Sequence, residues 1–164
     1  MHKEKEFPLP PSKVLIVDDN PQNLELLEAY MEDLPGVQTL TATNGLTALE
    51  VVRRERPDLV LLDVMMPKMS GFEVCKQMKA DPDIADIPVV MVTALNEPMD
   101  IERGLDSGTN DYLTKPVSRQ DLLGRVKSLL RSKHRKGQMD RSLAYMDELE
   151  SDMSEGFGSA EQEP

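Results

Sequence analysis

The chain has 164 residues, with 30 Asp and Glu against 19 Lys and Arg and a formal net charge of −11. This length is enough for one domain with an ordinary core and a short remaining segment. No apolar run approaches the ~20 residues that a membrane helix needs, and the charged first residues are not followed by the apolar stretch of a signal peptide. The single cysteine, Cys75, cannot form an internal disulfide, which suits a reducing compartment. We therefore expect a cytoplasmic protein that does not contact the membrane.

The charge is unevenly distributed along the chain. Residues 137–164 contain eight Asp and Glu and one Arg. A basic run precedes them, made of Arg125, Lys127, Arg131, Lys133, Arg135 and Lys136. Cations near the C-terminus of a helix complement the helix dipole and need no ligand. Because no recognition helix or aromatic platform accompanies this run, we expect no nucleic-acid partner.

Short apolar runs alternate with helical patterns from residue 12 to residue 134. Residues 1–11 end in Pro8-Leu9-Pro10-Pro11 and are predicted to be a disordered lead-in. The first helix is predicted to begin after Asn20, a favoured N-cap residue, with proline at its first position. Strands are predicted at 13–17, 37–43, 59–63, 88–93 and 111–113, and helices at 21–34, 46–52, 71–80, 99–106 and from 118 to about 130. Five strand–helix units in strict alternation predict a three-layer α/β fold.

The strands are nearly continuous apolar runs, which is typical of a parallel sheet buried on both faces. Each of four runs leads into a polar signal: Asp18-Asp19, Asp63, Thr93 and Lys115. The carboxyl ends of parallel strands meet at one edge of the sheet, where ligands bind in this class of fold. The sequence therefore predicts one pocket with three carboxylates, a hydroxyl and an ammonium group.

These groups suit phosphoryl chemistry. Like charges at close range destabilise one another, and a hard cation such as Mg²⁺, which takes carboxylate and phosphate oxygens, removes that conflict. Lys115 offers a compact positive charge for a phosphoryl oxygen, and Thr93 offers a hydroxyl donor. With these charges in place a carboxylate can act as a nucleophile and form an aspartyl phosphate. Asp63, at the end of the central strand, is the predicted nucleophile.

Each residue also has an ordinary structural interpretation when it is taken alone. Asp18 and Asp19 can complement a helix dipole, and Asp63 can simply end a strand. Tyr112 can be a core residue with a hydrated hydroxyl, and Lys115 can be a surface charge. The convergence of all these positions on the strand ends favours the functional interpretation.

Over residues 13 to about 131 the chain resembles the receiver domain of two-component response regulators. The motifs are VLIVDDN, LVLLDVMMPKMSG, VVMVTA and DYLTKPV, in order and with ordinary spacing. The resemblance implies a flavodoxin-like (βα)5 fold with a parallel sheet in the order 2-1-3-4-5. It also implies phosphorelay signal transduction, with Asp63 as the phosphoacceptor and a histidine kinase or phosphotransfer protein as the donor.

The family implies roles for the other pocket residues. Mg²⁺ would be bound directly by Asp19, Asp63 and the backbone carbonyl of Met65, with Asp18 acting through water. Thr93 would be the switch hydroxyl and Tyr112 the switch aromatic. Lys115 would bridge to the phosphoryl group, and the peptide bond between Lys115 and Pro116 is commonly cis in this family.

Two neighbours of the pocket predict a slow loss of the phosphoryl group. Met65 lies two residues after Asp63, and Leu95 lies two residues after Thr93. Neither side chain carries a polar group that could orient an attacking water. We therefore expect no enzymatic turnover beyond self-catalysed phosphotransfer and slow autodephosphorylation.

The predicted output lies in a partner or in another protein segment. The region expected to form helix four, strand five and helix five carries mixed charges at Asp100, Arg103, Asp106, Asp111, Arg119 and Lys127. Mixed charges of this kind suit a symmetric dimer, and the family commonly dimerises through this face when phosphorylated. The stretch 95–105 is similar to receivers that precede diguanylate cyclase outputs, but the chain lacks a GGDEF signature.

Two other functions are compatible with parts of the pattern. A phosphohydrolase would use the same aspartyl phosphate, but that class usually has a second acid–base Asp where this chain has Met65. A scaffold that docks without phosphate would need only the fold and the acidic tail. The complete set of pocket residues favours the phosphoacceptor over both.

Residues 135–164 form the acidic tail. Met139, Leu143, Met146, Leu149 and Met153 recur at steps of three and four, as in an amphipathic helix or coiled-coil arm. The same composition, with Gly137 at its start, is compatible with a disordered tail that is only transiently helical. We expect any helix to end at about residue 153, because the last residues have nothing to bury.

Overall fold

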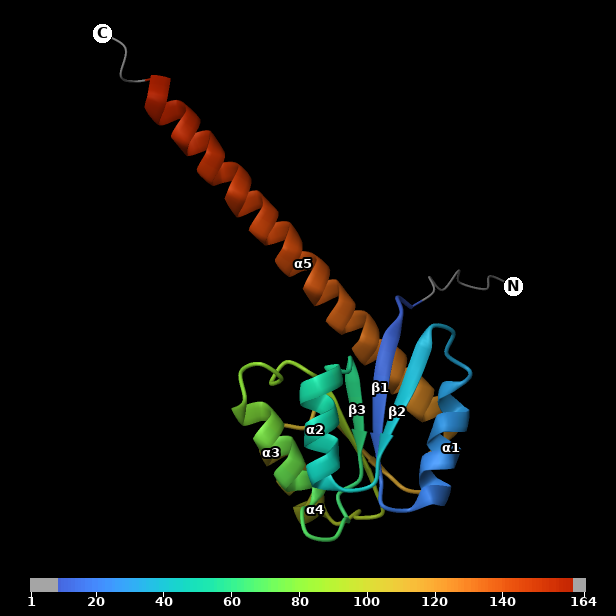
Figure 1. Ribbon diagram of the computed structural model, residues 1–164. Coiled ribbons are helices and arrows are strands. Elements are labelled where there is room, and N and C mark those ends of the chain that lie inside the picture. Colours follow the sequence, from blue (N-terminus) through green and yellow to red (C-terminus); the bar gives the residue numbers. More distant parts are fainter. Residues whose placement is uncertain (1–8, 161–164) are drawn as a thin grey trace. The chain divides into compact units, whose positions relative to one another are not determined.

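The computed structural model describes residues 9–160, and their side chains as far as residue 151. Within these residues, five strands and five helices alternate as the sequence predicts (Figure 1). The elements are β1 (Ser12–Val17), α1 (Pro21–Met31), β2 (Val37–Ala42), α2 (Gly45–Glu55), β3 (Leu59–Leu62), α3 (Gly71–Ala80), β4 (Val89–Thr93), α4 (Pro98–Asp106), β5 (Asp111–Thr114) and α5 (Arg119–Ala160). In the described part of the chain, no helix is both long enough and apolar enough to cross a membrane.

The strands form one parallel sheet in the order β2-β1-β3-β4-β5, which confirms the predicted flavodoxin-like topology. Every residue of β3 and β4 is buried. Helices α1 and α5 contribute to the core on one face of the sheet, and α2 and α3 to the core on the other (Figure 1). Both faces of the central strands are therefore covered, which explains why their sequences do not alternate between apolar and polar residues.

The local signals at the helix starts act as predicted. The Asn20 side chain accepts a hydrogen bond from the backbone N–H of Gln22, with Pro21 at the first position of α1. The hydroxyl of Ser118 accepts a hydrogen bond from the N–H of Asp121, 3.0 Å away. These contacts satisfy N–H groups that have no partner within the first turn of a helix.

The two ends of the described chain differ from the sequence-based expectation. Residues 1–8 and 161–164 lie outside the described part. Leu9, placed by the sequence in the lead-in, packs against the core on the α1 and α5 face, and the carbonyl of Pro10 accepts a hydrogen bond from the Ser12 hydroxyl. The ordered domain therefore begins before residue 12.

Helix α5 is longer than expected. It continues through Gly137 as far as Ala160, whereas the sequence predicted a helix to about residue 153 at most. A glycine inside a helix costs only about 1 kcal/mol relative to alanine, so Gly137 does not by itself end the helix. By its internal contacts the chain divides into a unit up to Arg131 and a second unit from Ser132 onward. We call residues 132–151 of α5 the arm.

Candidate functional site

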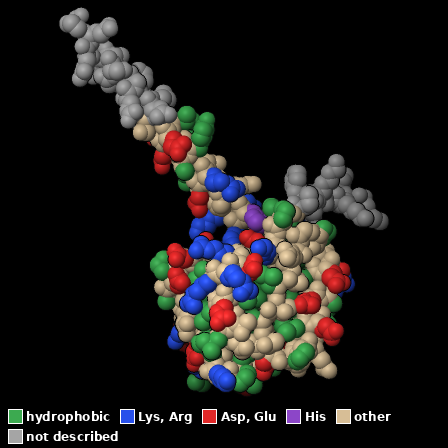
Figure 2. All heavy atoms as spheres, viewed as in Figure 1, with side chains coloured by type: hydrophobic (Ala, Val, Ile, Leu, Met, Phe, Trp, Pro, Cys, Tyr) green, Lys and Arg blue, Asp and Glu red, His purple; other side chains and the backbone are tan. Residues whose placement is uncertain are grey.

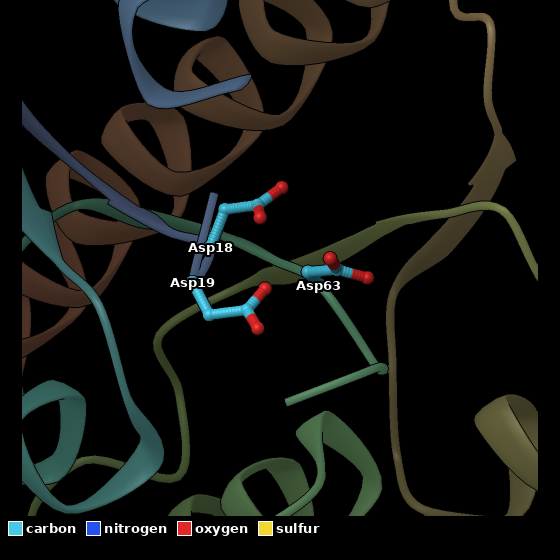
Figure 3. A group of neighbouring side chains, drawn as sticks. All are labelled: Asp18, Asp19 and Asp63. Carbon is cyan, nitrogen blue, oxygen red and sulfur yellow. The ribbon is translucent and has the colours of Figure 1, made fainter. Parts of the chain in front are cut away.

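Three carboxylates converge at the carboxyl edge of the sheet. Asp18 and Asp19 directly follow β1, and Asp63 directly follows β3. These strands are neighbours, and the Asp63 N–H donates to the carbonyl of Val17, 2.9 Å away. One carboxylate oxygen from each residue lies within 4.8 Å of the others, and all three groups face a common space (Figure 3). The prediction that parallel strand ends bring these residues together is confirmed.

The three carboxylates have different surroundings. Asp18 and Asp63 are buried, with 1% and 6% of their surfaces exposed, whereas Asp19 is exposed. Asp18 accepts a hydrogen bond from the N–H of Asn20, and Asp63 accepts one from the N–H of Met65 at 3.2 Å. Within the described residues, the Asp19 carboxylate has no hydrogen bond or ion pair. Asp19 is therefore the carboxylate whose charge is left for a ligand.

Lys115 joins the two buried carboxylates. Its ammonium nitrogen lies 2.8 Å from Asp18 Oδ2 and 3.3 Å from Asp63 Oδ2. The backbone positions it, because the Lys115 N–H donates to the carbonyl of Thr93 at 2.8 Å. The bond between Lys115 and Pro116 is cis, as the family resemblance implies. The sequence prediction that Lys115 lies in the pocket is therefore confirmed.

Burial and neighbouring charges have opposing effects on the pKa values of Asp63 and Lys115. Burial raises the pKa of Asp63, the nearby charge of Lys115 lowers it, and the charge of Asp18 raises it again. Burial by itself would lower the pKa of Lys115, but its hydrogen bond to Asp18 and the charge of Asp63 raise it overall. The ammonium is therefore held protonated, while the ionised form of Asp63 remains costly. Another positive charge at this edge would stabilise that ionised form.

Thr93 and Tyr112 lie beside the carboxylates on neighbouring strands. Thr93 is fully buried at the end of β4, and its hydroxyl oxygen accepts a 3.4 Å hydrogen bond from the N–H of Leu95. The Tyr112 hydroxyl donates to the carbonyl of Leu95 at 2.8 Å. Leu95 therefore joins the threonine at the pocket to the aromatic ring on β5. The structure connects the two predicted switch residues through this loop.

Two glycines allow close packing that the sequence analysis did not identify. A Cβ atom on Gly71 would lie 2.2 Å from the carbonyl oxygen of Asp63, and a Cβ on Gly104 would lie 2.7 Å from the ring of Tyr112. In the sequence, Gly71 is the first residue of the helix predicted at 71–80, and Gly104 lies inside the helix predicted at 99–106. Neither has a local sequence signal for its tertiary contact, because the neighbour comes from another part of the chain.

The donor set fits a hard divalent cation. All three side chains present carboxylate oxygens, which Mg²⁺ prefers. The Met65 side chain is 56% exposed, and its thioether is a soft donor that Mg²⁺ does not select. The site thus has the chemistry of an oxygen-lined magnesium site.

Comparison with known proteins identifies the family. The model of the response regulator receiver domain matches residues 14–127. The chain belongs to this family. Receiver domains are phosphoacceptors rather than classical enzymes, so the predicted class of function is confirmed.

Known relatives agree over the same region. Over 122 residues the receiver domain is 47% identical to response regulator PleD of Caulobacter vibrioides, covering 74% of this chain and 27% of PleD. The chain thus spans about a quarter of that relative.

Solved structures agree as well. A signal receiver domain of a histidine kinase from Syntrophus aciditrophicus is 39% identical, with a TM-score of 0.69 and coverage of 74% of this chain and 91% of that one. The receiver domain of sensor histidine kinase PA1611 from Pseudomonas aeruginosa is 29% identical, with a TM-score of 0.67 and coverage of 73% and 97%. That structure has a magnesium ion coordinated in its active site cleft.

Proposed function

We propose that this receiver domain accepts a phosphoryl group on Asp63 from a histidine kinase or a phosphotransfer protein in the cytoplasm. In this step the N–P bond of the donor phosphohistidine breaks, its electron pair stays on the imidazole, and an O–P bond forms to a carboxylate oxygen of Asp63. The observation that carries the proposal is the contact of Lys115 with both Asp18 and Asp63, next to the carboxylate of Asp19, which has no partner among the described residues.

The protein contributes position and charge to this transfer. Lys115 lies 3.3 Å from Asp63 Oδ2. After transfer the negative charge lies on the phosphoryl oxygens, and the ammonium of Lys115 can move to contact one of them. We assign Mg²⁺ to Asp18, Asp19 and Asp63 with the backbone carbonyl of Met65, and when bound it neutralises charge on the phosphoryl oxygens. The magnesium in the related P. aeruginosa receiver supports this assignment.

The new charge on Asp63 would be transmitted through Thr93. Phosphorylation adds negative charge and strong acceptor oxygens, which attract the buried Thr93 hydroxyl. That movement weakens its hydrogen bond with Leu95 and so affects the loop held by Tyr112. The ring of Tyr112 packs on Gly104, so α4 responds to a change at the ring.

A phosphorylation-dependent homodimer through α4, β5 and α5 remains part of the proposal. Within the chain, Arg103 stacks on Phe72 at 4.6 Å, Asp111 pairs with Arg125, and Arg119 pairs with Asp33. Most of the charges that suggested this dimer therefore have partners within the chain already. A dimer on this face would have to exchange some of these contacts for contacts with the second copy.

A single labelling experiment tests the proposed acceptor. The purified chain is incubated with acetyl phosphate and Mg²⁺, and the product is analysed by intact mass and peptide mapping. We expect one phosphoryl group, on Asp63, and none in Asp63→Asn. Asp58→Asn is the matched control, because Asp58 precedes β3 as Asp63 follows it. Labelling of Asp63→Asn at an undiminished rate would overturn the assignment.

The experiment also distinguishes the alternatives. A phosphohydrolase would release phosphate from esters over many turnovers, but the position two residues after Asp63 is the exposed apolar Met65. We therefore expect a single labelling event without multiple turnover. A phosphate-independent scaffold would take up no label at Asp63.

A further inference from the structure

Among the described residues, the arm carries an apolar face whose side chains are exposed. Its large exposed hydrophobic side chains are Met139, Leu143, Tyr145, Met146 and Leu149. None of them belongs to either hydrophobic core, and both Met139 and Met146 are more than half exposed. Figure 2 shows hydrophobic side chains gathered on the arm. An apolar stripe on a helix of this length is typical of a helix that packs against another helix.

Charged residues extend the same face in both directions. At 100° per residue, Met139, Leu143 and Met146 lie in a narrow strip. Arg135 lies on an earlier turn and Glu150 on a later turn. Together with the three apolar residues they span about 80° of the helix circumference. Along this face the helix is thus basic first, then apolar, and finally acidic.

Some of the arm's own charges destabilise its helix. Asp147 and Glu150 are three residues apart on the helix, where like charges repel each other. Acidic residues toward the C-terminal end of a helix also oppose its dipole. A Cβ added at Gly137 would contact nothing within 4 Å, so no packing offsets the entropic cost of that glycine. In proteins most helical stability comes from the packing of an amphipathic face, which a partner helix would supply here.

We propose that the arm pairs with the arm of a second copy of this chain in an antiparallel orientation. The two-fold axis passes between Ser142 and Leu143. In this register Met139 faces Met146 of the second copy, and Arg135 faces Glu150 of the second copy. Because a two-fold interface is isologous, each of these contacts occurs twice.

The charge order decides the orientation. A parallel pair in register would place Arg135 opposite Arg135 and Glu150 opposite Glu150, so both ends of the interface would join like charges. The antiparallel pair places opposite charges at both ends and keeps the methionines in the centre. Charges at the edge of a helical interface set partner orientation in this way.

This pairing is separate from phosphoryl transfer. None of its residues belongs to the carboxylate pocket, so the pairing does not need Mg²⁺ or a modified Asp63. It can therefore be tested on the unphosphorylated 164-residue chain, and its failure would leave the phosphoacceptor assignment untouched.

Disulfide trapping tests the orientation. Met139→Cys and Met146→Cys variants of the 164-residue chain are mixed in equal amounts and oxidised gently, with Cys75 left in place because it is fully buried. We expect the mixed 139–146 disulfide to exceed both homodisulfides, since the two positions face each other. Predominant homodisulfides would indicate a parallel pair and overturn the proposal, as would the absence of any arm disulfide.

Charge exchange tests the contacts by sedimentation equilibrium. Arg135→Glu and Glu150→Arg should each weaken dimerisation by about tenfold, because each creates two repulsive contacts per dimer. The double variant should restore the wild-type dissociation constant. Arg141→Glu and Glu148→Arg are matched controls on the opposite side of the helix, and they should leave the dissociation constant unchanged.

Circular dichroism of each variant establishes that the helix is retained. A wild-type protein that stays monomeric up to about 1 mM would overturn the proposal, because that affinity is negligible. Equal weakening by the control variants, or a double variant that is not restored, would also overturn it.

Discussion

The hydroxyl of Tyr112 is held by the backbone carbonyl of Leu95 at 2.8 Å. The N–H of the same residue donates to the hydroxyl of Thr93. Leu95 thus connects an aromatic side chain on β5 to the hydroxyl beside the proposed phosphorylation site. A change in either contact would therefore alter the position of the loop that leads into α4.

Tyr112→Phe tests this connection. The variant loses one hydrogen bond and should be destabilised by about 1 kcal/mol, with faster hydrogen exchange in the loop after β4. Thermal unfolding and hydrogen exchange measure the two effects. Tyr30→Phe is the control, because within the described residues the Tyr30 hydroxyl has no hydrogen bond. If both variants behave alike, the Leu95 contact has no special role.

Gly71→Ala should disturb the site through the backbone. The added Cβ would meet the Asp63 carbonyl at 2.2 Å, so α3 or the loop after β3 has to move. We expect a loss of about 2 kcal/mol or more in the free energy of unfolding and slower labelling of Asp63. Gly124→Ala, in α5 with nothing within 4 Å, is the control and should stabilise the protein by up to about 1 kcal/mol. Wild-type stability in Gly71→Ala would contradict the close packing.

Asp63→Asn should stabilise the metal-free protein at neutral pH. Burial raises the pKa of Asp63 in the folded state, so its ionised form costs stability at any pH above that raised value. Below the ordinary Asp pKa of about 3.9 the group is protonated in both states. The gain in melting temperature should therefore be largest near neutral pH and disappear on acidification.

Thermal unfolding of both proteins across this pH range, without Mg²⁺, measures the difference. Asp19→Asn is the control for removing a carboxylate from the same cluster, and because Asp19 is exposed its effect should be smaller. A stabilisation that increases toward acidic pH would have the wrong sign and would contradict the argument from burial.

Millimolar Mg²⁺ should raise the melting temperature, because it binds the folded carboxylate cluster and not the unfolded chain. Asp19→Asn should reduce the shift, since Asp19 is the carboxylate without a partner among the described residues. Glu25→Gln removes an exposed charge from α1 and should leave the shift intact. Equal shifts in all three proteins would indicate a non-specific salt effect.

Loss of the phosphoryl group should be slow and should respond to two substitutions. Met65 is exposed and Leu95 half-buried, and neither side chain can orient a water. Leu95→Glu together with Met65→Asn should accelerate hydrolysis by about tenfold or more, measured as decay of the labelled protein. Asn96→Glu places the same charge one residue away and should have little effect. Unchanged decay in the double variant would refute the explanation.

Much of the fold could be predicted because its signals are local. Apolar runs of four to six residues indicated the buried parallel strands, and Asn20 and Ser118 marked helix starts that the structure confirms. The site followed from one topological rule, since residues after parallel strands meet at one edge. That rule predicted from the sequence that Asp18, Asp63 and Lys115 lie close together.

The continuation of α5 was harder to predict. Gly137 and the weak apolar pattern were equally compatible with helix and with disorder, because helix propensities differ by only about 1 kcal/mol per residue. Differences of that size are too small to decide between a helix and a disordered segment. The helix therefore passes the point at which the sequence analysis ended it.

The amino-acid order alone determined the fold class, the strand ends and the residues that meet at the carboxyl edge of the sheet, because these depend on periodicity and residue chemistry. Only the tertiary structure decided that Lys115 contacts Asp18 as well as Asp63, that Leu95 joins Thr93 to Tyr112, and that Gly71 lies against the backbone of Asp63. Each of these is a contact between distant or non-adjacent parts of the chain. Its existence depends on distances of a few ångströms that are set by packing and not by the local sequence.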